Sequence, residues 1–221
     1  MPNNIIMADA SGYKASDWLD ETKPEGEVIY YGTNPAKYSL YQRSRVTGLI
    51  MPNAVWIPDS MVSGCTSLTK LIADEAIYAG QDACSRGTQL LTLVLPKLRY
   101  VYSNAFATCK TLKSVDFGGS PSESEGFFRN NVFSGDTVFD TLVLRANTVW
   151  PMVNINIFSS TPFASGKSGG TLYVPQAMIS EYQAANNWST ILGYPNNNIV
   201  AIEGSQYENY YVDGRPIPTG G

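Results

Sequence analysis

Residues 46–111 are three tandem copies of one 22-residue unit. The copies read VTGLIMPNAVWIPDSMVSGCTS from Val46, LTKLIADEAIYAGQDACSRGTQ from Leu68 and LLTLVLPKLRYVYSNAFATCKT from Leu90. Small or apolar residues recur at the same position of each copy, in the columns Leu49/Leu71/Leu93, Met51/Ala73/Leu95 and Ile57/Ala79/Val101. A fixed period of this length is typical of a solenoid, in which each short unit stacks on its neighbours and shares a core with them. The sequence therefore predicts an α+β repeat solenoid built from short parallel strands.

Weaker units extend the repeat in both directions. A degenerate unit at 24–45 aligns Ile29 with Met51 and Leu40 with Val62. After the three good copies, a fifth unit begins at Leu112 and keeps Val115 and Phe117 in the core columns.

The core of the fifth unit then returns later than the period predicts. Phe106 plus 22 gives position 128, but the next matching core residue is Phe133, and 133 − 128 implies an insertion of five residues. The insertion falls within GGSPSESEGFFRNN, residues 118–131, which we interpret either as a solvated loop or as a projecting binding loop. A sixth unit opens at Phe139 with Leu142 and Leu144 in register, and TLYVP (171–175) is the last strand of the repeats.

The pattern divides the chain into three segments. Residues 1–23 form a lead-in with a short cap helix at 15–21, residues 24–175 form the solenoid, and residues 176–221 form a C-terminal cap. In the cap, Met178, Ile179 and Tyr182 share one face of a helix, and Trp188 adds to the same cover. A further strand is expected at 199–202, followed by a hairpin at Asp213-Gly214.

The repeat register resembles that of BspA-type bacterial leucine-rich repeat proteins. LLTLVLPKLRYVYSNAFATC carries the likeness most fully, as L-x-x-L-x-L-P followed by V and A-F-x-x-C. The ends of the chain, SDWLDETKPEGEVIYYG and TLYVPQAMISEYQAANNWSTIL with IVAIEG, are similar to segments that flank such repeats in tail-associated proteins of gut bacteriophages. The resemblance covers roughly residues 15–204. It implies leucine-rich repeats with helical caps, and it constrains function less than fold.

Composition excludes several classes of partner. A net charge of −4 and a pI near 4.8 argue against nucleic acid, which needs a basic face. No apolar run approaches the roughly 20 residues of a membrane helix, so we expect no membrane insertion. MPNNIIMADASGYK lacks the basic and apolar regions of a signal peptide.

Cysteine use predicts buried thiols rather than a disulfide framework. The chain has three cysteines, and Cys65 and Cys109 share one column two turns apart, roughly 9–10 Å at the spacing of paired strands. That separation exceeds the reach of a disulfide. Cys84 falls in the column of Val62 and Phe106, and we expect all three thiols to fill the interior.

The sequence also argues against catalysis, a metal site and a cofactor. With no histidine, the chain has neither a Ser–His–Asp nor a Cys–His arrangement. No phosphate-binding glycine motif follows a strand. A solvated role accounts for the acidic residues, which lie in the N-terminal helix (Asp17, Asp20, Glu21), the repeat turns (Asp59, Asp74, Glu75) and the 118–131 loop (Glu123, Glu125).

The column Trp56, Tyr78 and Tyr100 is the first candidate for partner binding. Each aromatic precedes an inward residue, so strand alternation predicts an outward, exposed ladder. Such a strip suits a sugar or a protein surface. The alternative is that cross-strand pairing of the rings only stabilises the sheet. Tyr207, Tyr210 and Tyr211 in the tail are further candidates, because a lone hairpin is marginally stable and is expected to dock on something, such as another copy of the chain.

These observations predict a non-enzymatic binding or structural module. The resemblance implies a bacteriophage virion protein that attaches to a bacterial host surface. Its partners would be a host surface protein or glycan and other virion subunits. The alternatives are a bacterial cell-surface adhesin of the same repeat class and a purely architectural virion decoration protein.

Overall fold

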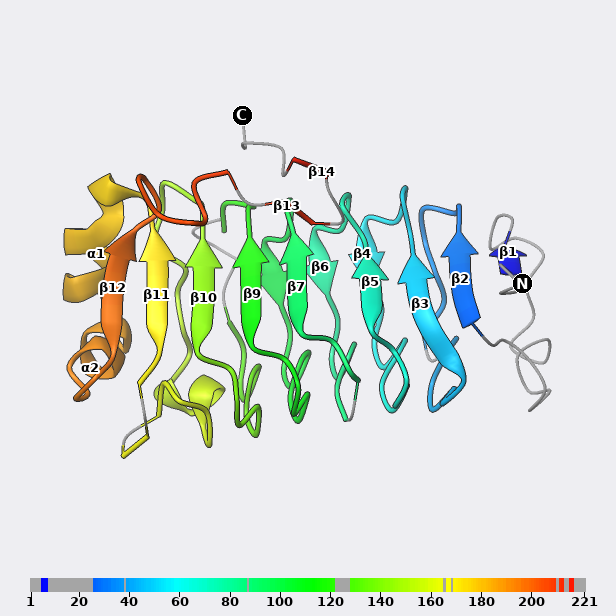
Figure 1. The fold of residues 1–221 in the computed structure, drawn as a ribbon, viewed down its shortest axis with the longest axis horizontal. Helices are drawn as coiled ribbons and strands as arrows, with labels where there is room; N and C mark the ends of the chain where they lie inside the picture. Colours follow the sequence, from blue (N-terminus) through cyan, green and yellow to red (C-terminus); the bar gives the residue numbers. More distant parts are fainter. Residues whose placement is uncertain are drawn as a thin grey trace.

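Short parallel strands pair side by side along the long axis of the molecule (Figure 1). The structure is a computed structural model that describes residues 26–37, 39–86, 88–121, 128–164, 166–167 and 169–209, and the backbone of 5–7, 211–212 and 215–216. One sheet has the strand order β1-β2-β3-β5 and another has the order β12-β11-β10-β9-β7. We call these the main strands: β1 (Ile5–Met7), β2 (Gly26–Tyr30), β3 (Val46–Ile50), β5 (Lys70–Ile72), β7 (Thr92–Leu95), β9 (Ser114–Phe117), β10 (Thr141–Leu144), β11 (Thr171–Val174) and β12 (Asn198–Ala201).

Residues one period apart pair with each other in the main strands. Leu49 lies opposite Leu71, and Leu93 lies opposite Val115. The predicted burial of the repeat core is confirmed, because Leu71, Leu93 and Leu95 are 6%, 1% and 0% exposed. The equal spacing keeps every apolar column on the inner side of the stack, so the core is continuous from one unit to the next.

A second layer of strands lies behind the main strands (Figure 1). It consists of β4 (Trp56–Ile57), β6 (Tyr78–Ala79) and β8 (Tyr100–Val101), all parallel. Their inward residues Ile57, Ala79 and Val101 are fully buried, as predicted. The described chain is thus mostly short parallel strands with few helices, which is compatible with the predicted repeat fold.

The turns that follow the back strands repeat as regularly as the strands. Two residues four positions apart adopt positive φ in successive units, in the columns Ser60/Asp82/Asn104/Asn131 and Gln42/Gly64/Arg86/Thr108/Gly135/Ser160. This left-handed region favours glycine and asparagine. Two features favour glycine at position 64. Its φ is +75°, and a Cβ there would lie 3.0 Å from Cγ of Gln42. Turn geometry is therefore shared by the units along with the apolar columns.

The degenerate unit at 24–45 departs from its predicted register by one residue. Ile29 pairs with Ile50 and not with Met51, after a register shift between Gly26 and Glu27. Val28 therefore points inward and is fully buried, while Ile29 is partly exposed. The prediction for Leu40 is correct, since this side chain is 1% exposed and its N–H donates to the carbonyl of Met61.

The five-residue insertion is confirmed by the backbone hydrogen bonds. The N–H of Cys84 donates to Ala105, an offset of 105 − 84 = 21 residues, whereas the N–H of Phe106 donates to Val132, an offset of 132 − 106 = 26. Phe128 is already back in the stack, because it bridges Val101 and Met152 and is fully buried. The extra residues therefore precede Phe128, in the stretch whose positions 122–127 lie outside the described residues.

The core changes character along the stack. Alanines, cysteines and aliphatic side chains fill the N-terminal half, whereas rings fill the C-terminal half. Neighbouring rings pack with centroids 4.4 Å apart for Phe133–Phe139, 4.7 Å for Phe158–Phe163 and 4.9 Å for Phe128–Trp150. We call this set the aromatic core; its fully buried members are Phe106, Phe117, Phe128, Phe133, Phe139, Trp150, Phe158, Phe163 and Trp188.

The predicted C-terminal helix is present and closes the aromatic core. A 3₁₀ turn at Gln176–Met178 leads into α1 (Ile179–Ala184), and α2 (Trp188–Leu192) follows. The Tyr182 hydroxyl accepts from the N–H of Trp150 at 3.1 Å, and Trp188 Nε1 donates to the Trp150 carbonyl at 2.6 Å. Another 3₁₀ turn, η3 (Ile155–Phe158), precedes β11.

The sheet continues beyond the predicted boundary at residue 175. β12 pairs in register with β11, Leu172 opposite Ile199, close to the further strand expected at 199–202. The expected hairpin is present as β13 (Tyr211–Val212) antiparallel to β14 (Arg215–Pro216). The cap helix predicted at 15–21 lies outside the described residues.

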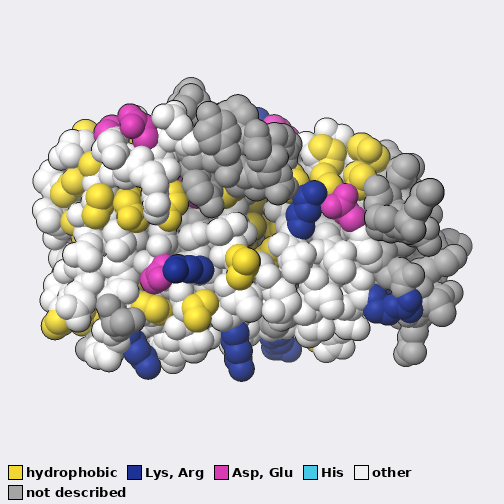
Figure 2. Space-filling model, in the orientation of Figure 1, with side chains coloured by type: hydrophobic (Ala, Val, Ile, Leu, Met, Phe, Trp, Pro, Cys, Tyr) yellow, Lys and Arg dark blue, Asp and Glu magenta, His cyan; other side chains and the backbone are white. Residues whose placement is uncertain are grey.

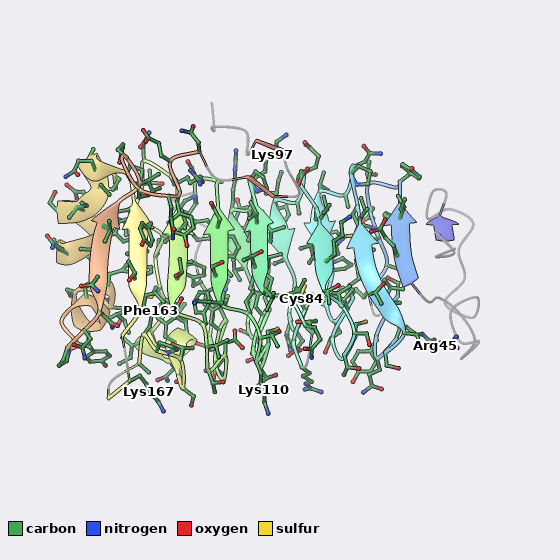
Figure 3. All side chains as sticks on the ribbon, in the orientation of Figure 1. Arg45, Cys84, Lys97, Lys110, Phe163 and Lys167 are labelled. Carbon is green, nitrogen blue, oxygen red and sulfur yellow. The ribbon has the colours of Figure 1, made fainter. Side chains whose placement is uncertain are left out.

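All three cysteines are free and buried, as predicted. The Cys65 thiol donates to the Leu40 carbonyl at 2.9 Å, and the Cys109 thiol donates to the Cys84 carbonyl at 3.0 Å. Each of these two thiols thus satisfies a buried carbonyl of an earlier unit. Figure 3 labels Cys84 in the middle part of the stack.

Candidate functional site

The back strands bring the predicted aromatic column together. Trp56 pairs with Tyr78, and Tyr78 pairs with Tyr100, in consecutive parallel strands. Because the following residue of each strand points into the core, these three rings lie on the outer side of the back layer. The sequence therefore predicted their shared column correctly.

The rings are less exposed than the predicted ladder. All three are only partly exposed. The rings of Tyr78 and Tyr100 stack nearly parallel, with centroids 4.4 Å apart and planes 13° apart. This distance is close to the strand spacing, so each of the two rings covers a face of the other. The indole N–H of Trp56 is buried without a hydrogen-bond partner among the described atoms.

More exposed apolar side chains surround the aromatic column. Val55 is 44% exposed and Tyr102 is 42% exposed. Ile77 lies in the column of Val55, and its N–H donates to the Val55 carbonyl at 2.7 Å. We define the back-face patch as Val55, Trp56, Ile77, Tyr78, Tyr100 and Tyr102. Contiguous exposed apolar groups of this kind mark interaction surfaces more often than isolated ones do.

Charges at the two borders of the back-face patch differ in their pairing. At the N-terminal border, Asp59 forms an ion pair with Lys37 and accepts a hydrogen bond from the N–H of Gln81. At the other border, Arg99 continues the column of Val55 and Ile77 and is exposed. No ion pair of its guanidinium occurs within the described part of the chain. Among the described residues, Arg99 therefore gives this border of the patch a positive charge without an ion-pair partner.

The tail candidates are placed differently. Tyr207 is only 8% exposed, and its ring contacts Tyr173 with centroids 4.6 Å apart. It belongs to a small second cluster with Val143 and Ile202 on the outer face of the main strands. The ring of Tyr207 therefore packs against residues of its own chain, and little of it is exposed for the predicted contact with a partner. Tyr210 and the side chain of Tyr211 lie outside the described residues.

A buried ion pair that the sequence did not predict holds this tail segment. Arg145 donates to both carboxylate oxygens of Asp116, with Nη2–Oδ2 at 2.7 Å and Nε–Oδ1 at 2.8 Å. Nη2 also donates to the carbonyl of Tyr207 at 2.7 Å. Burial raises the pKa of Asp116 despite the opposing effect of Arg145. The separation of 62 residues between Arg145 and Tyr207 left no local signal for this contact.

The three cysteine thiols and the Asp136 carboxyl are buried, and burial raises the pKa of each of them. Burial raises the pKa of the Cys65 thiol to about 12 and raises those of Cys84 and Cys109 as well. A thiol with a raised pKa is a poor nucleophile at neutral pH. Asp136 is fully buried, and burial raises its pKa to about 9. Its Oδ1 accepts from the N–H of Cys109 at 2.7 Å, which gives it a structural contact.

The outer face of the main strands is the other large surface of the stack (Figure 2). Hydrophobic groups lie among polar ones near β11 and β12, where Tyr173 is partly exposed and Val200 is 38% exposed. Figure 3 shows Arg45, Lys110 and Lys167 along the rim where the main strands begin. Lys97 lies on the opposite rim, where the strands end. Lys97 is paired there with Glu75 at 2.7 Å.

Two further features bear on the type of site. Within the described ranges, no group of three or more histidine, cysteine, aspartate or glutamate residues is arranged to hold a metal ion. No helix in the same part of the chain is long and apolar enough to cross a membrane. The alternative binding loop, 118–131, is described only at its two ends, where Pro121 and Phe128 are buried.

No known protein-family model matches the chain, and no curated protein sequence is significantly similar to it.

Proposed function

We propose that the chain is a solenoid of BspA-type leucine-rich repeats that serves as a non-enzymatic binding module. The parallel pairing of residues one 22-residue period apart supports the repeat architecture. The motif L-x-x-L-x-L-P supports the repeat class, and the flanking segments that resemble gut-phage tail proteins support the assignment to a virion. On this proposal the protein attaches a bacteriophage particle to a bacterial surface.

The back-face patch is the observation that carries the binding role. It places apolar and aromatic side chains on consecutive units, where solubility alone favours polar residues. The lack of histidine and the buried, high-pKa thiols support a role without catalysis. Tyrosine and tryptophan are also enriched among the residues whose loss weakens interfaces most.

The test is binding of the purified protein to cells of candidate gut-bacterial hosts. Tyr102→Ser removes an exposed ring without touching the Tyr78–Tyr100 stack, and Trp56→Ser with Tyr78→Ser removes the column. We expect each variant to weaken binding at least about tenfold, the effect of losing a contact worth about 1.4 kcal/mol. Leu91→Ser is the matched control, because Leu91 is 64% exposed and lies outside the patch.

The outcomes separate the alternatives. Failure of the wild-type protein to bind any host cell, together with binding to purified virion subunits, would favour an architectural virion protein. If the Tyr102→Ser variant binds host cells as well as the wild-type protein does, the contact lies outside the back-face patch. Thermal melts of each variant distinguish lost binding from lost folding.

A further inference from the structure

We infer that the back-face patch recognises a protein surface and not a glycan. This inference rests on the proposed binding function and names the class of its partner. A flat aromatic strip that binds sugars offers the faces of its rings, because the apolar side of a sugar packs on a ring face. The geometry of the patch is different.

The ring faces in the patch are already partly covered. Tyr78 and Tyr100 stack on each other at 4.4 Å and 13°, so each uses one face on its neighbour. Both residues are only partly exposed, and the stacked face of each ring is closed to a ligand. Ring edges and hydroxyl groups suit the mixed contacts of a protein interface better than the stacking of a sugar.

The polar end of Trp56 is also covered. Its indole N–H is buried and makes no hydrogen bond to the described residues. The group that would otherwise hydrogen-bond a sugar hydroxyl is therefore unavailable at the surface. Two observations, the stacked tyrosines and the buried indole N–H, thus disfavour a sugar independently.

The remaining surface of the patch fits a protein with an apolar centre and an acidic border. Val55 and Tyr102 supply exposed apolar area at 44% and 42% exposure. Arg99 supplies a positive charge at one border, whereas Asp59 at the other border is neutralised by Lys37. Charge complementarity therefore places a carboxylate of the partner opposite Arg99.

The experiment compares two treatments of host cells before the intact protein is added. Protease treatment removes surface proteins, and mild periodate oxidation destroys sugar rings. We expect protease to reduce binding at least about tenfold and periodate to leave it within about twofold. Arg99→Glu should lower binding and reverse its salt dependence, because salt then screens a repulsion, whereas Arg99→Lys should keep most of the binding. Lys110→Glu is the control, because Lys110 is an exposed cation on a different rim.

Each outcome decides one of the two claims. Binding that survives protease, or that periodate abolishes, overturns the protein partner and leaves the binding function standing. An unchanged salt dependence in Arg99→Glu overturns the role of Arg99. Absence of binding to all untreated hosts overturns the proposed function and this inference with it.

Discussion

Leu93 shows how much one column residue contributes to the stack. It is 1% exposed, and it pairs with Val115 in the next main strand. Truncating a buried leucine leaves a cavity that a close-packed interior fills only in part. We expect Leu93→Ala to lower the free energy of unfolding by about 2–5 kcal/mol. A urea melt of the variant that matches the wild-type melt would contradict this packing.

Asp136 makes stability depend on pH. Burial raises its pKa from 3.8 to about 9, so the folded protein holds the neutral carboxyl at pH 7. The unfolded chain ionises near 3.8, and unfolding between these pH values therefore releases a proton. The contribution of Asp136 to the free energy of unfolding is fully present below about pH 4. It falls by up to about 1.4 kcal/mol per pH unit as the pH rises toward 9.

The variant Asp136→Asn isolates this effect. An asparagine keeps the oxygen that accepts from Cys109 and cannot ionise. We expect its advantage in melting temperature over the wild-type protein to grow steadily from pH 4 to pH 9. Asp140→Asn is the control, since it removes a carboxylate from a surface ion pair with Lys113 and not from the interior. Parallel pH profiles for the wild-type protein and Asp136→Asn would rule out a raised pKa.

At the level of elements, the C-terminal helices close the aromatic core. Tyr182 and Trp188 are both fully buried and both bond to the backbone of Trp150. Deleting residues 176–221 would remove both rings and expose Trp150, Phe158 and the open edge of β11. We expect the truncated protein to aggregate or to lose cooperative unfolding, as measured by size-exclusion chromatography and thermal melts. A truncated protein that stays monomeric and melts cooperatively would show that the helices are dispensable.

Regular elements were predictable from sequence where the period was strict. The columns of Leu71 and Ile57, the insertion before Phe133 and the C-terminal helix all follow from spacing and amphipathic pattern. The register of Ile29 was wrong because a one-residue shift leaves no mark in a short apolar strand. The Tyr78–Tyr100 stack depends on side-chain rotamers, and the contact of Arg145 with Tyr207 depends on tertiary folding. Neither is encoded in a local period.

For the whole molecule, the same strand spacing sets both the core and the surface. Main strands and back strands repeat together, so residues at the same outer position of neighbouring units lie side by side. The back-face patch arises in this way, from one column of aromatics beside a second column of aliphatic residues. The proposed binding surface and the core therefore lie on the same strands, and variants of the patch should be judged by melts as well as by binding.

The uneven filling of the core has a consequence for optical measurements. Trp150 and Trp188 are fully buried in the C-terminal half, whereas Trp56 is partly exposed in the N-terminal half. Tryptophan emission at short wavelength therefore reports mainly on the C-terminal half, while far-ultraviolet circular dichroism reports on all strands. Because each unit contacts mainly its neighbours, the small-residue half is free to melt first. We expect the dichroism melt to precede the shift in emission, and coincident transitions would mean that both halves unfold as one.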